Sequence, residues 1–440
     1  MRASPDRIAV AMRVIARHFF EHALKESSID QAFRRHVVCE RDVLRICEDL
    51  YDLNSYRRRF VISMGKAAHG LLTALEIQAG DRFEGIVASS VATAWQVRGF
   101  RYFGGGHPMP NHESIRAADA ILKSVAGQDA SSLVIYLLSG GGSSMVEKPL
   151  ADEISLEELV GTYRALVHSG APIAEINAIR KHLSAVKGGK LARAAYPAQQ
   201  VSILVSDVPD DTPDALASGP TMPDSTTVGD CYAIASKYEM LTRFPSSVRR
   251  LFERRALDET PKSDDPAFQR SRWWTVLSNA SLFAALKPEA ERHGFRVEVD
   301  NRCDDWDYLK ASDYLLDRLR ELRKQSERVC LISGGEVTVK LTEGGTGGRN
   351  QQFALACAEK IAAENITILS AGTDGIDGNS LAAGAVVDGT TLERGRVHGM
   401  DAKTYLRGFN AYLYFEKLGD TVVTGPTGNN LRDLRILLAH

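Results

Sequence analysis

The chain has 440 residues, of which 44% are hydrophobic and 25% charged, and its formal net charge at pH 7 is -2. Such a chain is expected to form two or three globular domains. The near balance of charge excludes a strong attraction to nucleic acid or to an anionic membrane. We therefore expect small-molecule partners, no nucleic-acid or membrane partner, and a monomer or a homodimer.

The N-terminal residues predict a helix of the fold and not a secretion signal. Apolar side chains at Ile8, Met12, Ile15, Phe19 and Ala23 follow helical spacing, and charged residues interrupt them. No stretch approaches the roughly 20 apolar residues needed to span a bilayer. The six cysteines lie far apart and form no pair typical of a zinc site or a disulfide framework. Free thiols suit a reducing compartment, so we expect a cytoplasmic protein.

Short apolar runs alternate with helical segments along the chain. The run ending at Met64 leads through Gly65 and Lys66 into a helix predicted over 69–77. Further runs occupy residues 85–88, 133–138, 201–205, 274–277, 329–332 and 366–369. Continuous apolar runs of this length are typical of parallel strands covered on both faces. They predict an α/β fold with a Rossmann-like, doubly wound N-terminal domain. A polar stretch over 244–272 suggests domains at 1–255 and 270–440.

Ligands bind at the carboxyl ends of parallel strands, so the residues after each run are the first candidates. Lys66 follows one strand and offers a mobile positive charge, although it could also be a solvated residue at a helix start. A second strand leads into a turn rich in backbone and hydroxyl donors, which fits a carboxylate or a phosphate. That turn is Ser139, Gly140, Gly141, Gly142, Ser143 and Ser144. A tight strand-to-helix connection is the alternative explanation.

Cations and carboxylates follow at other strand ends. Lys187 belongs to a run of cations over 180–190, which is either a solvated face or a surface that receives polyanionic ligands. Asp207, Asp374 and Asp377 each follow an apolar strand, where a carboxylate suits Mg²⁺ or a general base. Turn-forming hydrogen bonds are the alternative for all three. His107, in a glycine-rich loop, is either a substrate contact or a polar loop residue.

The stretch 329–365 contains the most informative turn. An apolar run ends at 332, alternation continues through Val337, Val339 and Leu341, and a glycine-rich break precedes a helix predicted over 349–360. The break, Gly345, Thr346, Gly347 and Gly348 after Gly344, exposes backbone N–H groups where the helix dipole favours an anion. Arg349 at the helix start is unfavourable there unless an anion lies beside it. The turn is therefore predicted to bind phosphate.

Two anion-binding turns, mobile cations and carboxylates at strand ends are typical of phosphoryl transfer. The chain has no Walker sequence and no protein-kinase catalytic loop. It instead resembles the class II glycerate 2-kinases, which join a glycerate kinase domain to a leucine-rich C-terminal domain called MOFRL. The resemblance covers nearly the whole length, through 64–68, 106–108, 139–144, 177–189, 206–208, 217–221, 345–351, 372–378 and 425–428. The chain departs from the family pattern at Asn379, Ser380 and Asn429, and these residues are expected to touch no catalytic group.

The resemblance implies ATP-dependent phosphorylation of D-glycerate at its 2-hydroxyl, with Mg²⁺, and it implies that Lys66 and Arg349 are the main catalytic cations. We assign Asp207 to the base or the metal, and Asp374 and Asp377 to the metal or the nucleotide. Phosphate or substrate binding is assigned to both glycine-rich turns, to Lys187 and to Asn350.

Family members also carry the name hydroxypyruvate reductase, so an NAD(P)H-dependent reductase is the alternative enzyme. Both glycine-rich turns lack the G-x-G-x-x-G/A pattern of a dinucleotide site, because residue 350 is Asn and residue 145 is Met. A nucleotide-binding protein without activity is a third possibility, and the presence of Lys66, Arg349 and the acidic loops argues against it.

Overall fold

The computed structural model describes residues 5–341 and 344–440. The chain forms two compact units. The parallel-sheet unit comprises Ala32–Val276, and the mixed-sheet unit comprises Met1–Gln31 together with Leu277–His440. The predicted domain ranges differ from these units in that the N-terminal helix belongs with the C-terminal part of the chain. The polar stretch over 244–272 contains the helix α10 (Ser246–Glu253) and the start of a strand of the parallel-sheet unit.

The parallel-sheet unit has a six-stranded sheet in the order β6-β5-β4-β7-β8-β9. Its strands are β4 (Arg58–Met64), β5 (Glu84–Ser89), β6 (Phe100–Gly104), β7 (Ser132–Ser139), β8 (Gln199–Val205) and β9 (Ser271–Leu277). The first five are paired in parallel. Numbered along the chain, this order is the 3-2-1-4-5-6 order of a Rossmann fold, so the predicted doubly wound architecture is confirmed. The order reverses between β4 and β7, which is where such sheets bind ligands.

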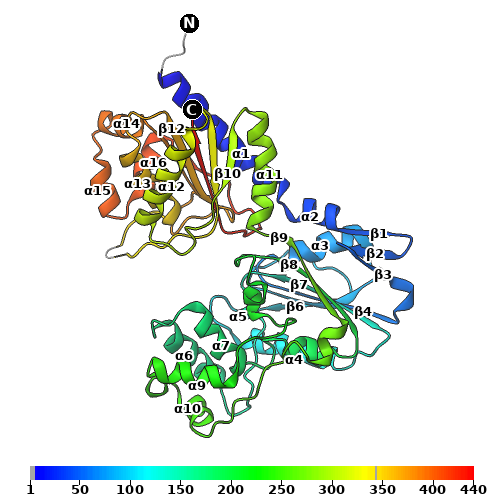
Figure 1. Ribbon diagram of the computed structural model, residues 1–440. Helices are drawn as coiled ribbons and strands as arrows, with labels where there is room; N and C mark the ends of the chain where they lie inside the picture. Colours follow the sequence, from blue (N-terminus) through cyan, green and yellow to red (C-terminus); the bar gives the residue numbers. More distant parts are fainter. Residues whose placement is uncertain (1–4, 342–343) are drawn as a thin grey trace. The chain divides into compact units, whose positions relative to one another are not determined.

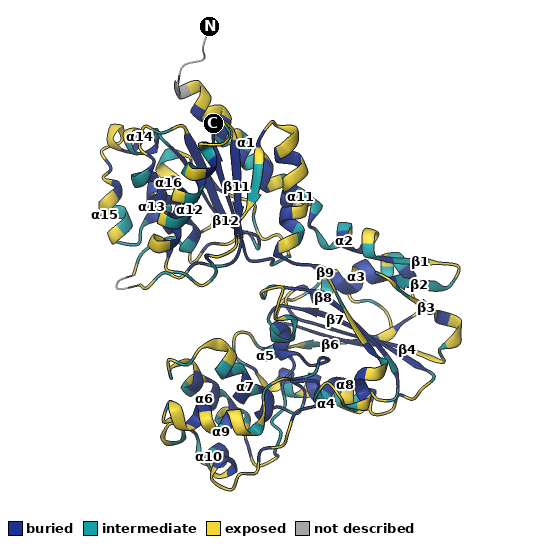
Figure 2. Ribbon diagram, in the orientation of Figure 1, coloured by how far each residue is buried: buried dark blue, intermediate teal, exposed yellow. Residues whose placement is uncertain are grey.

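The helices of this unit have exposed outer faces, while the central strands β4, β5, β7 and β8 of its sheet are mostly buried (Figure 2). These helices are α2 (Ile29–His36), α3 (Ala68–Ala79), α4 (His112–Val125), α5 (Gly142–Met145), α6 (Leu156–Val167), α7 (Ile173–Leu183), α8 (Lys190–Ala195) and α9 (Val228–Lys237), with α10. The short strands β1 (Val37–Glu40), β2 (Val43–Ile46) and β3 (Asp49–Asp52) form a separate antiparallel sheet.

The mixed-sheet unit has a second six-stranded sheet, in the order β10-β11-β15-β12-β13-β14 (Figure 1). Its strands are β10 (Arg296–Val299), β11 (Val329–Ser333), β12 (Ile366–Gly372), β13 (Gly384–Asp388), β14 (Thr421–Val422) and β15 (Asp433–Ala439). Its helices are α1 (Pro5–Glu26), α11 (Asn279–Arg292), α12 (Tyr308–Arg323), α13 (Arg349–Lys360), α14 (Thr391–Val397), α15 (Ala402–Arg407) and α16 (Ala411–Leu418).

Two features of this sheet differ from the sequence-based expectation. The last strand, β15, lies antiparallel between β11 and β12, so the sheet is mixed and not parallel. The alternating stretch over 337–341 forms no strand and makes only an isolated bridge between Thr338 and Asp307. The helix predicted over 349–360 is confirmed at the same residues. Within the described residues, no helix is both long and apolar enough to cross a membrane, and all six cysteines are free thiols.

Candidate functional site

The carboxyl ends of β4, β7 and β8 bring several predicted residues together in the parallel-sheet unit. The Lys66 backbone N–H donates to the carbonyl oxygen of Gly140 at 2.9 Å, and the Ala67 N–H donates to Ser139 Oγ at 3.1 Å. A Cβ atom on Gly65 would lie 2.3 Å from Ser139 Oγ, so only glycine fits this approach. The turn after β4 is therefore fastened to the turn after β7, and the Lys66 side chain is exposed beside it.

Asp207 and His107 border the same turn. A Cβ atom on Gly140 would lie 1.9 Å from Asp207 Oδ2, which places that carboxylate directly over the turn backbone. His107 Nδ1 lies 3.3 Å from Ser144 Oγ. Partial burial and the nearby Lys66 ammonium lower the pKa of His107. His107, which the sequence left open between substrate contact and loop residue, thus lies at the cluster as a neutral imidazole at pH 7.

Most cations over 180–190 interact with other groups of the protein itself. The Lys187 side chain is buried, and its ammonium pairs with Glu147 and donates to the Tyr163 hydroxyl at 3.1 Å. Lys181 pairs with Asp214 and Asp224. The expectation of a solvated cationic face is wrong for these two lysines, because both are buried and paired with carboxylates. Contact of Lys187 with substrate remains a prediction, and its observed contacts are structural.

In the mixed-sheet unit the glycine-rich turn leads into α13, whose first backbone donors are capped by Asp377. Its two carboxylate oxygens accept from the N–H groups of Asn350 at 3.1 Å and Gln351 at 2.9 Å. A Cβ atom on Gly348 would lie 2.3 Å from Asp377 Oδ1, so glycine is required for this approach. Burial raises the pKa of Asp377 to about 6. Its predicted role as a metal ligand remains a prediction, since both oxygens already hold the helix N-terminus.

Arg349, the first residue of α13, is fixed by acidic residues of the protein itself. Its Nε donates to Asp433 Oδ2 at 2.7 Å, and one terminal nitrogen donates to Asp433 Oδ1 at 2.9 Å and lies 2.8 Å from Glu336 Oε1. Burial disfavours the charged guanidinium, but its hydrogen bonds to the Asp433 carboxylate raise the pKa of Arg349 overall. A bound anion is therefore not needed to explain a cation at this helix start.

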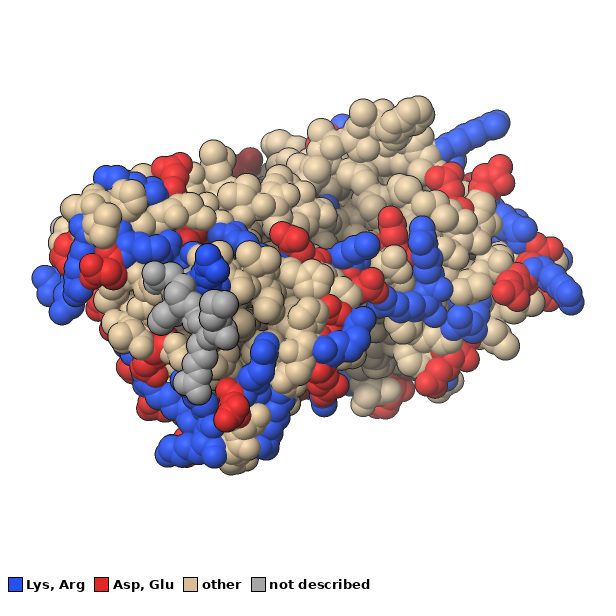
Figure 3. Space-filling model, turned by 90° about the horizontal axis from the view of Figure 1, so that it is seen from above, with Lys and Arg blue, Asp and Glu red and all other residues tan. Residues whose placement is uncertain are grey.

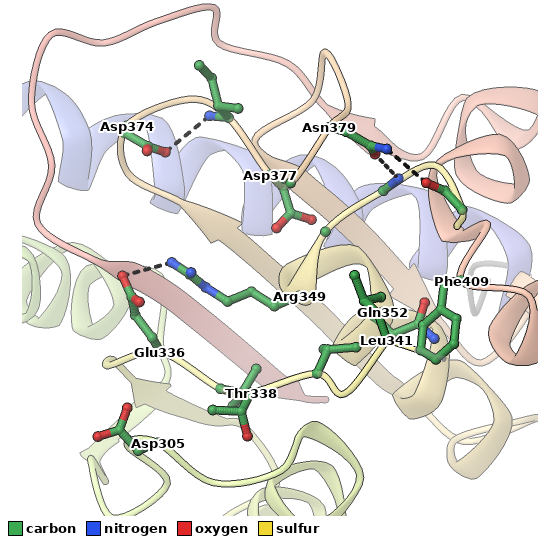
Figure 4. Close-up of a pocket in the computed structure, with 17 residues that line it drawn as sticks. Asp305, Glu336, Thr338, Leu341, Arg349, Gln352, Asp374, Asp377, Asn379 and Phe409 are labelled. Carbon is green, nitrogen blue, oxygen red and sulfur yellow. Dashed lines mark hydrogen bonds and ion pairs between the residues drawn. The ribbon is translucent and has the colours of Figure 1, made fainter. Parts of the chain in front are cut away.

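Arg349, Glu336 and Asp377 line a cavity of about 690 Å³ (Figure 4). Figure 4 shows the Arg349 side chain extending from α13 toward Glu336, with Asp374 and Asp377 nearby. The lining also includes Asp305, Gln352, Asn379 and Phe409, and three of the four glycine-turn residues Gly345, Gly347 and Gly348. A volume of this size accommodates a nucleotide or a comparable small molecule.

Carboxylate oxygens on the wall of this cavity suit Mg²⁺, which takes one or two carboxylates with phosphate oxygens and water. Asp374 Oδ1 accepts from the Ile376 N–H at 3.1 Å, and the residue is half-buried at the cavity wall. Asp305 is exposed at the same cavity. The donor set therefore fits a hard cation carried by a phosphate ligand.

The sequence did not single out three residues that shape this cavity. Asp433 was missed because it begins an unexpected strand, and its register opposite Gly372 brings it to Arg349. Asn379 was expected to touch no catalytic group, and its amide instead holds the turn: it donates to the Gly345 carbonyl at 2.8 Å and accepts from the Gly347 N–H at 2.9 Å. Asn410 accepts from the Thr346 N–H. The glycine-rich turn is thus held by side chains that no local pattern identifies.

The predicted site residues fall into two sets, one in each unit. A Rossmann-order sheet with a glycine- and serine-rich turn at its switch point, together with a carboxylate-lined cavity at a helix N-terminus, defines an α/β protein with two candidate ligand sites.

Comparisons with known proteins identify the family. A model described as "Domain of unknown function (DUF4147)" matches residues 15–253, and the MOFRL family model matches residues 329–433. D-glycerate 2-kinase of Thermotoga maritima is 35% identical over 386 residues, which are 86% of this chain and 90% of that protein. A crystal structure of glycerate kinase from Thermotoga maritima has a TM-score of 0.85 and 32% identity, covering 98% of this chain and 100% of that one. The chain belongs to the class II glycerate 2-kinase family, with a MOFRL domain at its C-terminal end.

A further relative, from Agrobacterium vitis, bears the provisional name hydroxypyruvate reductase. It is 38% identical over 388 residues, which are 87% of each chain. The names in the family therefore include both enzymes that the sequence suggested.

Proposed function

We propose that the protein is a glycerate 2-kinase that transfers the γ-phosphoryl group of ATP to the 2-hydroxyl of D-glycerate. The observation that carries the proposal is the match to D-glycerate 2-kinase across nearly the whole of that protein. The site geometry supports it, because cations, hydroxyls and carboxylates collect at strand ends of a Rossmann-order sheet. Such positioning and charge neutralisation provide most of the catalysis in phosphoryl transfer.

In the proposed reaction the 2-hydroxyl oxygen of glycerate forms a bond to the γ-phosphorus, and the bond from that phosphorus to the β,γ-bridging oxygen breaks. ADP leaves, and the hydroxyl proton passes to a base. We assign this base to Asp207, because its carboxylate lies over the turn that follows β7. Lys66 and Arg349 would neutralise the transferring group. Asp374 would hold a nucleotide-bound Mg²⁺, which supplies further charge neutralisation at the phosphate oxygens.

The two glycine-rich turns are assigned to their ligands by the size of the cavity that one of them lines. The turn of the mixed-sheet unit lines a cavity large enough for a nucleotide, so we assign it to ATP together with Asn350 at the start of α13. The turn over Ser139–Ser144 is then left for the glycerate carboxylate. Its hydroxyls are partly engaged already, since Ser143 Oγ lies 2.8 Å from Ser218 Oγ.

The experiment that tests the proposal is a steady-state assay with D-glycerate, ATP and Mg²⁺, in which enolase is added directly to the product. Direct consumption by enolase identifies 2-phosphoglycerate and supports the attacked hydroxyl. Consumption only after addition of phosphoglycerate mutase means attack by the 3-hydroxyl and contradicts the regiochemistry. NAD(P)H oxidation with hydroxypyruvate, without ADP formation, would instead establish the reductase.

A further inference from the structure

A cluster of histidine and glutamate side chains joins two helices of the mixed-sheet unit. His18 of α1 and Glu289 of α11 approach to 2.9 Å, from Nε2 to Oε1. His293, directly after α11, places Nδ1 at 3.5 Å from the same oxygen. One ligand-type atom from each residue lies within 4.8 Å of the other two, and within the described residues this is the only such group of three or more. The two helices pack against each other (Figure 1).

The spacing of these atoms matches what a transition metal requires. Zn²⁺ binds imidazole nitrogen and carboxylate oxygen at about 2.0–2.2 Å, so tetrahedral ligand atoms lie roughly 3.3 Å apart. The two observed separations, 2.9 and 3.5 Å, lie on either side of that value. A carboxylate with two imidazoles is a donor set that suits zinc, copper and nickel better than Mg²⁺.

A fourth side chain stands beside the three. His22 follows His18 by one helical turn, so both face the same side of α1, and their ring centroids are 6.1 Å apart. Glu289 and His293 have the same spacing on the facing segment. The arrangement thus offers three ligands at once and a fourth after a side-chain rotation.

We propose that His18, Glu289 and His293 form a binding site for Zn²⁺ or a similar transition-metal ion, with His22 or water as the fourth ligand. The site is structural. It contains none of the residues assigned to phosphoryl transfer, and it stands whether or not the protein phosphorylates glycerate.

The metal has to displace existing interactions. His293 Nδ1 lies 3.0 Å from the Glu289 carbonyl oxygen, and Glu289 Oε2 pairs with Arg292. Both are replaceable, because His293 and Arg292 have side chains 36% and 69% exposed and Zn²⁺ compensates for the lost contacts. Glu289, only 8% exposed, is held in place. The competing explanation is a hydrogen-bonded ion pair that binds no metal.

Metal binding would fasten the N-terminal helix to its unit. His18 and Glu289 are 271 residues apart in sequence, and Phe19 beside His18 packs edge-on against the His293 ring at 5.2 Å between centroids. The bound ion would be a cross-link between α1 and α11, and a ligand that binds only the folded state raises its stability.

The experiment uses the full-length, tag-free protein treated with EDTA and then dialysed. Zn²⁺ is titrated calorimetrically, the bound metal is counted by mass spectrometry, and the thermal unfolding midpoint is measured with and without Zn²⁺. We compare the wild type with His18→Gln and His293→Gln, which replace half-exposed side chains, and with the control His398→Gln, an exposed histidine elsewhere in the same unit. Circular dichroism checks that each variant is folded.

We expect wild type and the control to bind one Zn²⁺ per chain with a raised unfolding midpoint. Each site variant should bind at least about tenfold more weakly, since even indirect supports of a metal site change affinity that much. Substituting Co²⁺ should give visible absorption bands of a tetrahedral site in the wild type and the control, and not in the two site variants. Zinc binding that is equal in all four proteins, or no binding by the folded wild type, would overturn the proposal.

Discussion

The two cations proposed for phosphoryl transfer are held in different ways. Lys66 is exposed on a turn, and its position is fixed only through its backbone. Arg349 is held by a bidentate contact to the buried Asp433 and a further contact to Glu336. A flexible point charge suits a group that moves during transfer, whereas a planar fork suits a fixed orientation.

Replacing either cation with alanine should lower turnover by about 10² or more, the typical cost of losing one transition-state charge contact. Arg349→Lys should remain strongly impaired, because lysine cannot reproduce the bidentate contact with Asp433. Steady-state kinetics with D-glycerate and ATP measure both effects. Near-normal turnover in a folded Lys66→Ala or Arg349→Ala protein would remove that residue from the mechanism.

The Asp377 carboxyl group is expected to make the stability of the protein around the start of α13 depend on pH. Its ordinary pKa is 3.8 and burial raises the folded value to about 6, so between these values the folded state binds more protons than the unfolded chain. The stability that this raised pKa contributes to the folded state is therefore fully present below pH 4, and it is lost as the pH rises to about 6.

Asp377→Asn removes this titration, so the stability of wild type relative to the variant should fall between pH 4 and pH 6. Hydrogen exchange of the α13 amides, measured on both proteins at the same pH values, isolates the effect because intrinsic exchange rates cancel. If the exchange rates of the wild type and the variant changed with pH in parallel, the Asp377 carboxyl group would titrate at its ordinary pKa in the folded protein.

At the scale of elements, the turn after β7 depends on a residue without a side chain. Asp207 occupies the space that a Cβ atom on Gly140 would need, so Gly140→Ala must displace the carboxylate from the turn. If Asp207 is the base, turnover should fall about 10²-fold or more, since general base catalysis contributes that much.

Gly104→Ala is the matched control, because a Cβ atom there meets nothing within 4 Å at the end of the edge strand β6 of the same sheet. It should keep wild-type turnover. The kcat of both variants is compared after circular dichroism has verified the fold. A Gly140→Ala protein as active as the control would exclude a catalytic role for Asp207 at its observed position.

The central strands of the parallel-sheet unit, the strands β11 and β12 of the mixed-sheet unit and the helix α13 were predictable because their signals are local. Continuous apolar runs identified β7, β8, β11 and β12, and a glycine break followed by an uninterrupted helical pattern identified α13 at its observed ends. The strand β15 is equally apolar but lies at the very end of the chain. Its place between β11 and β12 depends on pairing with strands about 70 and 100 residues earlier, which no local pattern contains.

At the scale of the whole molecule, charge is evenly mixed. On the face in Figure 3, basic and acidic side chains are interspersed, in keeping with the net charge of -2. This agrees with the expectation of small-molecule partners, for which no extended field of one sign is required.

The first helix belongs to the unit that the end of the chain forms. Met12, Phe19, Phe20 and Ala23 of α1 are buried, and α1 packs against α11 and the strands β12, β13 and β15. Deleting residues 1–26 should therefore unfold or destabilise the mixed-sheet unit, since the two phenylalanines alone contribute about 3–6 kcal/mol of burial.

The parallel-sheet unit should remain folded in that deletion variant, because its sheet and core lie within Ala32–Val276. Limited proteolysis followed by mass spectrometry identifies which fragments resist digestion. Equal resistance of both units to the protease would show that α1 is dispensable for the mixed-sheet unit.

The sequence by itself determined the α/β class, the family, the strand ends and the residue types that collect there, because each of these depends on neighbours along the chain. Only the tertiary structure decided how those residues are used. It paired Lys187 with Glu147 and Arg349 with Asp433, capped α13 with Asp377, and placed α1 beside α11. Charges that look alike in the sequence acquire different roles because the energy of a charge depends on its burial and on partners that only folding brings near.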